Sequence, residues 1–212
     1  KQLILFTLFG LLFNQFCYLS AVRLTNAGTA TVFQCLQLVV VMGYTCVTTH
    51  RLPRTREALG ILLALGGTFL IATGGDPSTL NISPMGLVAG LLCAVGGACM
   101  VIIPAGILNE YGSPVVTGSA MLSAGIALSI FTQPWAHMPA LEPSGIGALA
   151  VFIVVGSFFA YMFYMQGVKD IGSVRASLIG TMEPVSATIT SAIMLGTVFL
   201  PTDLIGFAMI IA

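Results

Sequence analysis

The chain has 212 residues, of which 57% are hydrophobic and 7% charged, and its mean hydropathy is +1.04. Soluble domains carry about 25% charged residues, so seven basic and seven acidic side chains cannot cover the surface of a water-soluble protein. The net charge of zero and the lack of basic runs argue against a nucleic-acid partner. The composition predicts an all-α integral membrane protein whose surroundings are the lipid bilayer.

A helix needs about 20 apolar residues to cross a bilayer. In chain order, eight segments meet or approach this length: Leu3–Val22, Ala27–Thr49, Glu57–Gly74, Pro84–Leu108, Ser113–Gln133, Ile146–Val168, Ser173–Phe199 and a truncated Asp203–Ala212. The connections between them are short and rich in turn and charge signals, so no soluble domain is expected. Because the chain begins and ends inside apolar runs, we expect a fragment that is open at both ends.

The charged residues of the connections predict the orientation. When the connections are numbered alternately, one side of the membrane holds six basic residues and the other holds Arg23 alone. The six are Lys1, Arg51, Arg54, Arg56, Lys169 and Arg175. Basic residues concentrate on the cytoplasmic side of membrane proteins. Trp135 and His137 then fall on the outer side, where an interfacial tryptophan anchor is expected.

A shift of 146 residues brings the first three spans into register with the last three. Phe6, Gly10, Phe13, Tyr18, Val22, Ala30, Val39 and Gly60 then fall on Phe152, Gly156, Phe159, Tyr164, Val168, Ala176, Val185 and Gly206. The fourth and fifth spans have no counterparts, so two further spans are expected before Lys1. Ten spans would form two copies of five. Because five is odd, the second copy would be inverted, as in many secondary transporters, whose substrate site lies near the midplane.

Small residues predict where helices pack closely. Gly86, Gly90, Ala94 and Ala98 recur at four-residue spacing, and Gly60, Gly67 and Gly74 lie seven apart. Such stripes let helices approach each other in lipid. Pro104 is expected to kink the fourth span.

The five cysteines lie inside apolar stretches without CxxC or His spacing, so they are predicted to pack and to bind neither metal nor another cofactor.

Two stretches carry a family resemblance. They are "YLSAVRLTNAGTATVFQ", which continues to "RLPRTREALGILLALGGTFLIATGG", and "EPVSATITS", which is followed by "LPTDLIGFAMIIA". Over essentially its whole length the chain resembles the EamA-type families of the drug/metabolite transporter (DMT) superfamily. The resemblance implies ten-helix transporters of small metabolites, amino acids among them, built from inverted five-helix repeats. Residues 1–75 would hold the last three spans of the first repeat, and residues 84–212 a second repeat truncated in its last span.

The chain departs from the family pattern at one point. Many members have Gly-Glu at the end of the proline-bearing span, where this chain has Gly196-Thr197, and His50-Arg51 in the first copy. No residue of this chain matches that family glutamate, so no role of the glutamate is assigned here.

Glu183 and Pro184 stand inside an apolar span. Glu183 lies ten residues after Ser173, about 15 Å along a helix and hence near the bilayer centre. An acidic residue there costs about 2.5–3.5 kcal/mol and marks a pathway or relay by default. Pro184 deprives the Gly180 carbonyl of its helical donor, which is tolerated beside a cavity or within protein. The sequence predicts a hydrated cavity; the alternative is a protonated Glu183 that links helices.

Other polar side chains are predicted to face the same cavity. Gln34 and Gln37 share a helix face and align with Gly180 and Glu183 in the repeat register. Two further pairs, each with a tyrosine, share faces on the first and sixth spans, although buried tyrosines are often only core aromatics. The predicted substrate pathway comprises Asn14, Tyr18, Gln34, Gln37, Tyr161, Tyr164, Glu183 and Pro184.

The predicted function is secondary transport. The chain would move a small metabolite, an amino acid or similar, by alternating access in the inner or plasma membrane, with export as the predicted direction. His50 and His137 fall on opposite sides, and neither GxSxG nor a P-loop occurs, which argues against an enzyme and an ATPase. Two alternatives stay open: a nucleotide-sugar or phosphate exchanger of the same superfamily, and a non-transporting scaffold. Proton coupling through Glu183 and the oligomeric state also stay open.

Overall fold

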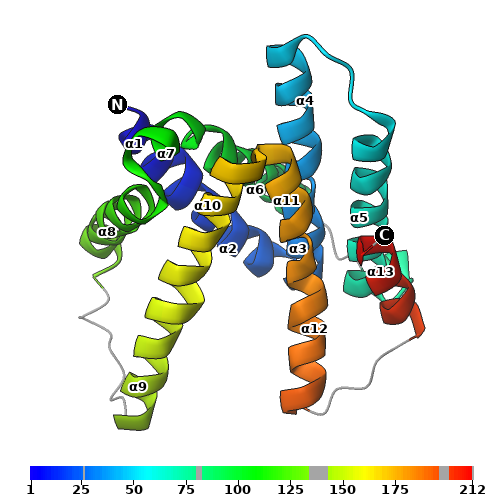
Figure 1. Cartoon of the computed structure of the whole chain (residues 1–212). Coiled ribbons are helices and arrows are strands. Elements are labelled where there is room, and N and C mark those ends of the chain that lie inside the picture. Colours follow the sequence, from blue (N-terminus) through cyan, green and yellow to red (C-terminus); the bar gives the residue numbers. More distant parts are fainter. Residues whose placement is uncertain (26, 80–82, 134–142, 196–200, 212) are drawn as a thin grey trace.

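The computed structural model describes residues 1–25, 27–79, 83–133, 143–195 and 201–211, whose regular structure is helical (Figure 1). Within them, six helices are long and apolar enough to cross a membrane: Gln2–Leu24, Gly28–Thr49, Thr55–Thr73, Pro84–Tyr111, Ser113–Ile130 and Gly145–Ile171. These correspond to the first six predicted spans. The protein is an all-α integral membrane protein, as its composition predicted.

Neither of the last two predicted spans is one helix of membrane-crossing length in the described residues. The seventh is formed by α11 (Ser173–Gly180) and α12 (Met182–Leu195), and its predicted end at 196–199 lies outside the described residues, as do Trp135 and His137. The eighth is α13 (Pro201–Ile211), which is apolar but has only 11 residues.

Several spans consist of more than one helical segment. The first three contain α1 (Gln2–Leu5), the π-helix η1 (Phe6–Phe13), α2 (Asn14–Leu24), α3 (Ala27–Cys35), α4 (Gln37–Thr49) and α5 (Thr55–Thr73). The 3-10 turn η2 (Pro77–Thr79), α6 (Pro84–Ile102), α7 (Ala105–Tyr111), α8 (Ser113–Thr132), α9 (Pro143–Val151), the π-helix η4 (Phe152–Phe159) and α10 (Ala160–Ile171) follow. The buried Pro104 separates α6 from α7, which confirms the predicted distortion of the fourth span.

Local sequence explains where the helices begin and end. Ser83 caps α6 by accepting a hydrogen bond from the Gly86 N–H at 3.0 Å, and Pro84 occupies the first helical position, where its missing N–H costs nothing. α5 ends at Thr73, and its C-cap residue Gly74 has a left-handed φ of 61°. Gly172, with a φ of 84°, makes the tight turn between α10 and α11.

Element boundaries recur at the predicted interval of 146 residues. The starts of η1, α2, α3 and α5 are matched by those of η4, α10, α11 and α13: Phe6 and Phe152, Asn14 and Ala160, Ala27 and Ser173, Thr55 and Pro201. π-Helices make up well under 1% of residues in proteins, and the two described here, η1 and η4, begin 146 residues apart. Matched elements also run in opposite directions in Figure 1: α3–α4 rises where α11–α12 descends, and α5 descends where α13 rises.

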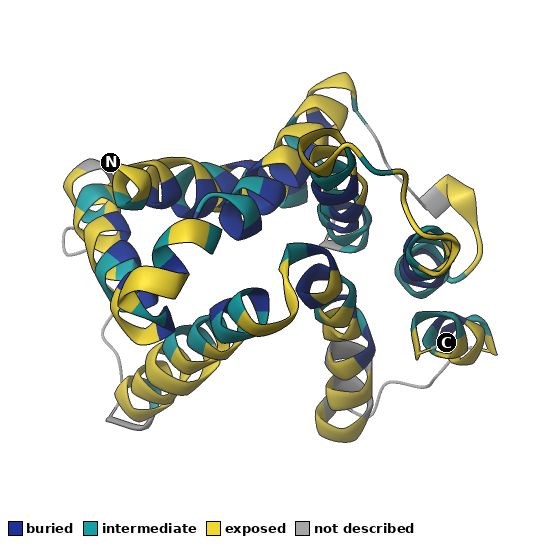
Figure 2. Ribbon diagram, turned by 45° about the horizontal axis from the view of Figure 1, so that its top comes forward, coloured by how far each residue is buried: buried dark blue, intermediate teal, exposed yellow. Residues whose placement is uncertain are grey.

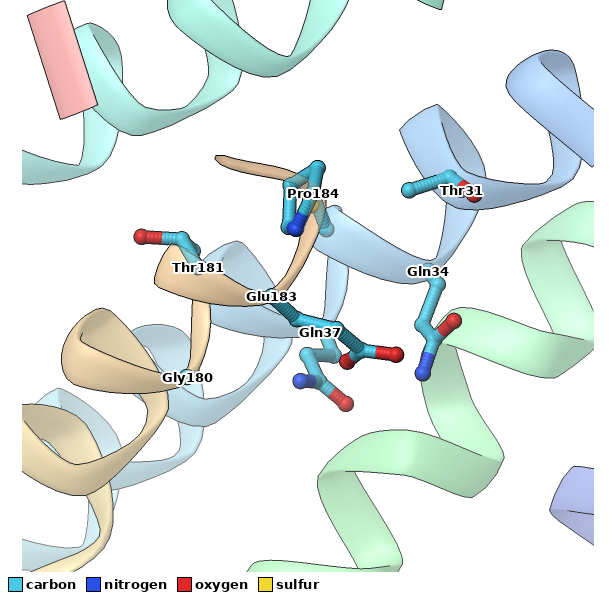
Figure 3. A pocket seen from close by; sticks show the side chains of 8 residues that line it. Thr31, Gln34, Gln37, Gly180, Thr181, Glu183 and Pro184 are labelled. Carbon is cyan, nitrogen blue, oxygen red and sulfur yellow. The ribbon is translucent and has the colours of Figure 1, made fainter. Parts of the chain in front are cut away.

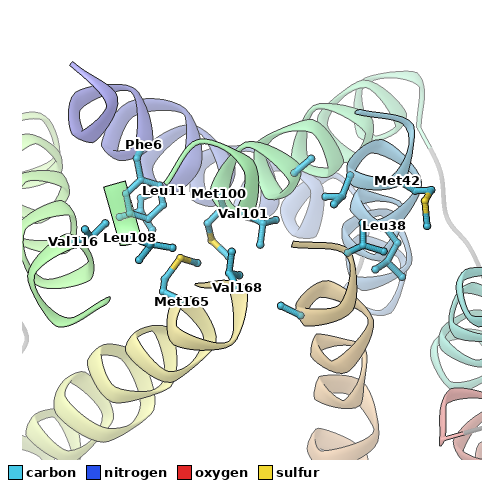
Figure 4. Packing of buried hydrophobic residues seen from close by; sticks show 14 of the residues in the cluster. Phe6, Leu11, Leu38, Met42, Met100, Val101, Leu108, Val116, Met165 and Val168 are labelled. Carbon is cyan, nitrogen blue, oxygen red and sulfur yellow. The ribbon is translucent and has the colours of Figure 1, made fainter. Parts of the chain in front are cut away.

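Buried residues gather where the helices face each other, and the outer faces are apolar and exposed (Figure 2). Phe16 and Leu62, for example, are 71% and 65% exposed, as expected of side chains that face hydrocarbon. The core cluster joins η1, α4, α6, α7, α8 and α10, and it includes Phe6, Leu38, Val101, Leu108, Val116 and Met165 (Figure 4). Through this cluster, α10 packs against helices of the first half of the chain.

Glycines allow the closest helix approaches, as predicted. On α6, Gly90 lies against the Phe33 ring and Gly96 against the Asn14 backbone. Where α5 meets α13, a Cβ added to Gly67 would lie 2.6 Å from the Gly206 carbonyl oxygen. A Cβ on Gly206 would lie 2.8 Å from the Gly67 carbonyl oxygen. The two backbones are therefore in direct contact.

Candidate functional site

A cavity of about 420 Å³ opens between the two halves of the chain. Its walls come from α3, α4, α6, η4, α10, α11 and α12, through Gln34, Gln37, Met100, Gly156, Ala160, Tyr161, Tyr164, Gly180 and Glu183. A recess of about 20 Å³ adjoins it and is lined by Thr31, Gln34, Cys35, Gln37, Gly180, Thr181, Glu183 and Pro184. Four residues line both spaces, so we treat them as one site, the Glu183 cavity.

Breaks in two helices place the polar groups of this cavity. α11 ends at Gly180, and at the break the Thr181 N–H and hydroxyl both donate to the Leu178 carbonyl, at 3.1 and 2.6 Å. α12 begins at Met182, so Glu183 and Pro184 lie in its first turn. Proline is well suited to a first turn because the N–H groups there have no helical acceptor. A carboxylate in the first turn is also stabilised by the helix dipole.

The first half of the chain repeats this arrangement. α3 ends at Cys35, and Gln37 is the first residue of α4. Gln37 and Glu183 are equivalent in the 146-residue register, and each stands at the start of the second part of a broken helix. In membranes, irregular backbone is tolerated where it is buried in protein or lines a water-filled cavity. The breaks thus explain why an acidic residue and a proline occur together in this span.

The Glu183 carboxylate points toward the amides of Gln34 and Gln37 (Figure 3). The residue is exposed to the cavity. Among the residues that the structure describes, no side chain donates a hydrogen bond to this carboxylate. The arrangement leaves its oxygens available to water or to a bound molecule.

Tyr161 and Tyr164 of α10 contribute another part of the cavity wall. The Tyr164 hydroxyl lies 3.4 Å from the Oγ of the buried Ser177. The Tyr161 hydroxyl accepts a hydrogen bond from Gln15 Nε2 at 3.4 Å. The missing side chain at Gly180 admits the Tyr164 ring, because a Cβ there would lie 3.3 Å from Tyr164 Cε2.

Six of the eight residues predicted for the pathway line the Glu183 cavity: Gln34, Gln37, Tyr161, Tyr164, Glu183 and Pro184. Asn14 and Tyr18 do not line it. Asn14 is 5% exposed and faces α6, where the Cys93 Sγ donates to its Oδ1 at 3.7 Å. Tyr18 is half-buried one turn further along the same helix. The side of α2 that carries Asn14 is turned toward the packing interface with α6.

Other lining residues were not predicted. Thr31 stands three residues before Gln34, and the shared helix face was a signal that could have found it. Met100, Gly156 and Ala160 are apolar or small and occur in stretches that are mostly apolar. Nothing in their sequence context distinguishes them from packing residues.

The chemistry of the cavity suits a small polar molecule. It offers one carboxylate, two amides and two phenols, and no Lys or Arg occurs among its described lining residues. Such a site favours a neutral or positively charged group over a phosphate. In the described part of the chain, no group of three His, Cys, Asp or Glu side chains is placed to hold a metal ion.

Comparisons with known proteins agree with this architecture. The EamA-like transporter family matches residues 1–73 and 84–212. The chain is 30% identical over 212 residues to the "Uncharacterized inner membrane transporter YicL" of Salmonella typhimurium, which covers all of this chain and 70% of that protein. It is 24% identical to the "Uncharacterized transporter YcbK" of Bacillus subtilis over 74% of this chain and 52% of that one.

A solved structure, described only as "Crystal structure of protein", shares the fold with a TM-score of 0.74. It is 21% identical in sequence, and the match covers 97% of this chain and 71% of that one. The family match spans nearly the whole sequence, and the chain folds as a multi-pass helical membrane protein. The chain therefore belongs to the EamA-like transporter family of the DMT superfamily and is a membrane transporter.

Proposed function

We propose that this protein moves a small metabolite, an amino acid or a similar amine, by alternating access around the Glu183 cavity, with export as the direction. The observation that supports this most is the pair of broken helices, α3–α4 and α11–α12, whose breaks carry Gln37 and Glu183 into one cavity. Discontinuous helices at the interface of two repeats are the usual substrate site of secondary transporters.

Contacts between equivalent residues support an inverted repeat. Gln15 and Tyr161 are 146 positions apart and share a hydrogen bond, and α5 packs directly on its counterpart α13. Elements related by a twofold axis touch their own counterparts only close to that axis. The proposed axis would pass beside Tyr161, which lines the Glu183 cavity. The cavity would then lie between the two halves, and the transport cycle would rock one half against the other.

The alternatives make different demands on the cavity. An exchanger of nucleotide sugars or phosphates would need basic groups there, and none occurs among the described lining residues. A scaffold would need no accessible carboxylate, whereas Glu183 is exposed to the cavity. Both observations favour the transport of neutral or cationic metabolites.

The test is a flux measurement with the whole protein in proteoliposomes, with and without a pH gradient. We expect at least one labelled amino acid or amine to exchange about tenfold faster than in protein-free liposomes, and sugar phosphates to show no such exchange. Flux restricted to phosphorylated compounds would favour the exchanger. Equal leakage of every compound with and without protein would favour the scaffold.

Single cysteines test the proposed orientation in the plasma or inner membrane. In a background without the five native cysteines, we expect Arg54→Cys and Lys169→Cys to react with an impermeant maleimide only from the cytoplasmic side. Asp76→Cys should react only from the outside, because the connections alternate across the membrane. Labelling of all three positions from one side would contradict the assigned topology.

A further inference from the structure

A second cavity, of about 480 Å³, lies where the connection between α4 and α5 meets the turn between α10 and α11. It is lined by Thr45, Arg51, Arg54, Glu57, Ile171, Gly172, Ser173, Val174 and Arg175. We call it the arginine pocket. It shares no residue with the Glu183 cavity, and the proposed transport cycle assigns it no role.

The pocket carries uncompensated positive charge. Three arginines line it against one carboxylate, which leaves two positive charges. Glu57 is already engaged, because Arg51 Nη1 and Nη2 donate to its two oxygens at 3.2 and 3.3 Å and the Arg54 N–H donates at 3.1 Å. Among the described residues, neither the Arg54 nor the Arg175 guanidinium forms an ion pair with a carboxylate, and both side chains are exposed.

The start of α11 adds further donors to the same wall. Gly172 is its N-cap residue and cannot cap the helix with a side chain. The Ser173 hydroxyl is directed elsewhere, toward the Val101 carbonyl at 3.2 Å. The first N–H groups of a helix have no intrahelical acceptor and bind anions well. Ser173, Val174 and Arg175 therefore bring free backbone donors and a guanidinium to one place.

We propose that the arginine pocket binds a phosphate group, held by Arg54, Arg175 and the first turn of α11. Guanidinium groups bind phosphate through paired, charge-assisted hydrogen bonds. The pocket lies at the ends of membrane-spanning helices, on the side that the charge distribution predicts to be cytoplasmic. Basic pockets in that position commonly hold anionic lipid headgroups, so the nearest source of the phosphate is an anionic phospholipid.

Occupancy would couple the pocket to the conformation of the protein. Arg54 belongs to the first half of the chain, and Arg175 to α11, which runs on toward Glu183. A phosphate held by both bridges the halves on one side of the membrane. It therefore stabilises the arrangement in which the α4–α5 connection and the start of α11 are close, and opposes any motion that separates them.

The experiment measures lipid binding to the whole purified protein by native mass spectrometry. The probes are phosphatidylglycerol, zwitterionic phosphatidylcholine and inorganic phosphate as competitor. We expect the Arg54→Gln/Arg175→Gln variant to bind phosphatidylglycerol at least tenfold more weakly than the unaltered protein. Arg56→Gln removes an exposed arginine that does not line the pocket. Its affinity for phosphatidylglycerol should stay within twofold of that of the unaltered protein. Phosphatidylcholine should not distinguish the three proteins.

The competitor identifies the source of the phosphate. Displacement of phosphatidylglycerol by millimolar inorganic phosphate would assign the pocket to a soluble phosphate compound, and the absence of displacement would assign it to the lipid. Equal affinity of the double variant and Arg56→Gln would overturn the site. If the double variant elutes as an aggregate, Arg54→Lys/Arg175→Lys keeps the charge without the paired geometry. In that case the lysine variant should bind phosphatidylglycerol at least threefold more weakly than the unaltered protein. Because binding is measured without flux, this result is independent of the transport proposal.

Discussion

Glu183→Gln is expected to lower substrate flux by about ten- to a hundredfold while leaving the fold intact. A hydrogen bond to a charged group contributes about 1.5–3 kcal/mol, and each 1.4 kcal/mol corresponds to a factor of about ten. The Glu183 carboxylate faces the cavity and has no side-chain donor among the described residues. Its loss should therefore weaken the binding of the substrate and have little effect on the stability of the protein. Only the interaction with the helix dipole is lost, about 0.3–1 kcal/mol.

The measurement is counterflow in proteoliposomes, at several pH values and with and without a pH gradient. Glu110→Gln is the matched control, because it makes the same chemical change at an exposed residue of α7 away from the cavity. If Glu183 also carries a coupling proton, stimulation by the gradient should disappear in the variant. A scaffold would show the reverse result, with altered stability and unchanged flux. Flux equal to that of the unaltered protein at every pH would reject Glu183 as a substrate-binding or coupling group.

Gly67→Ala is expected to destabilise the protein by about 1–3 kcal/mol, the usual cost of overpacking a tight interface. The added methyl group would meet the Gly206 carbonyl oxygen, which belongs to a backbone that cannot move without displacing α13. At the neighbouring Gly66, the same change meets only the terminal methyl group of Met209. That flexible side chain can rotate away, so Gly66→Ala should cost much less.

Gly43→Ala completes the series. Nothing lies within 4 Å of the position that its Cβ would take, so the substitution should be neutral or should stabilise α4 by up to about 1 kcal/mol, the difference in helix propensity. The three variants are compared by thermal unfolding in one detergent. Equal midpoints for Gly67→Ala and Gly43→Ala would show that α5 and α13 do not pack through their backbones in the folded protein.

The sequence was sufficient for the fold class and for the order of the first six spans along the chain. Its composition required a membrane protein, and the lengths of its apolar runs located the first six spans to within a few residues. The starts of η4, α10, α11 and α13 follow those of η1, α2, α3 and α5 by the 146 residues of the sequence register. Glu183 could be predicted to line a cavity because a carboxylate at mid-bilayer depth is costly unless it faces water or protein.

Rotation about the helix axes was decided only by the tertiary structure. Asn14 and Tyr18 were predicted to face the cavity, but the close approach of α2 to Gly96 turns that face toward α6. Pro184 indicated a disturbed helix near Gly180, but the break at Leu36, the contact between α5 and α13, and the common pocket of Arg54 and Arg175 could not be predicted. Lipid tails are as apolar as the side chains that pack between helices. The apolar pattern therefore records that a helix lies in the membrane, but not which of its faces meets protein.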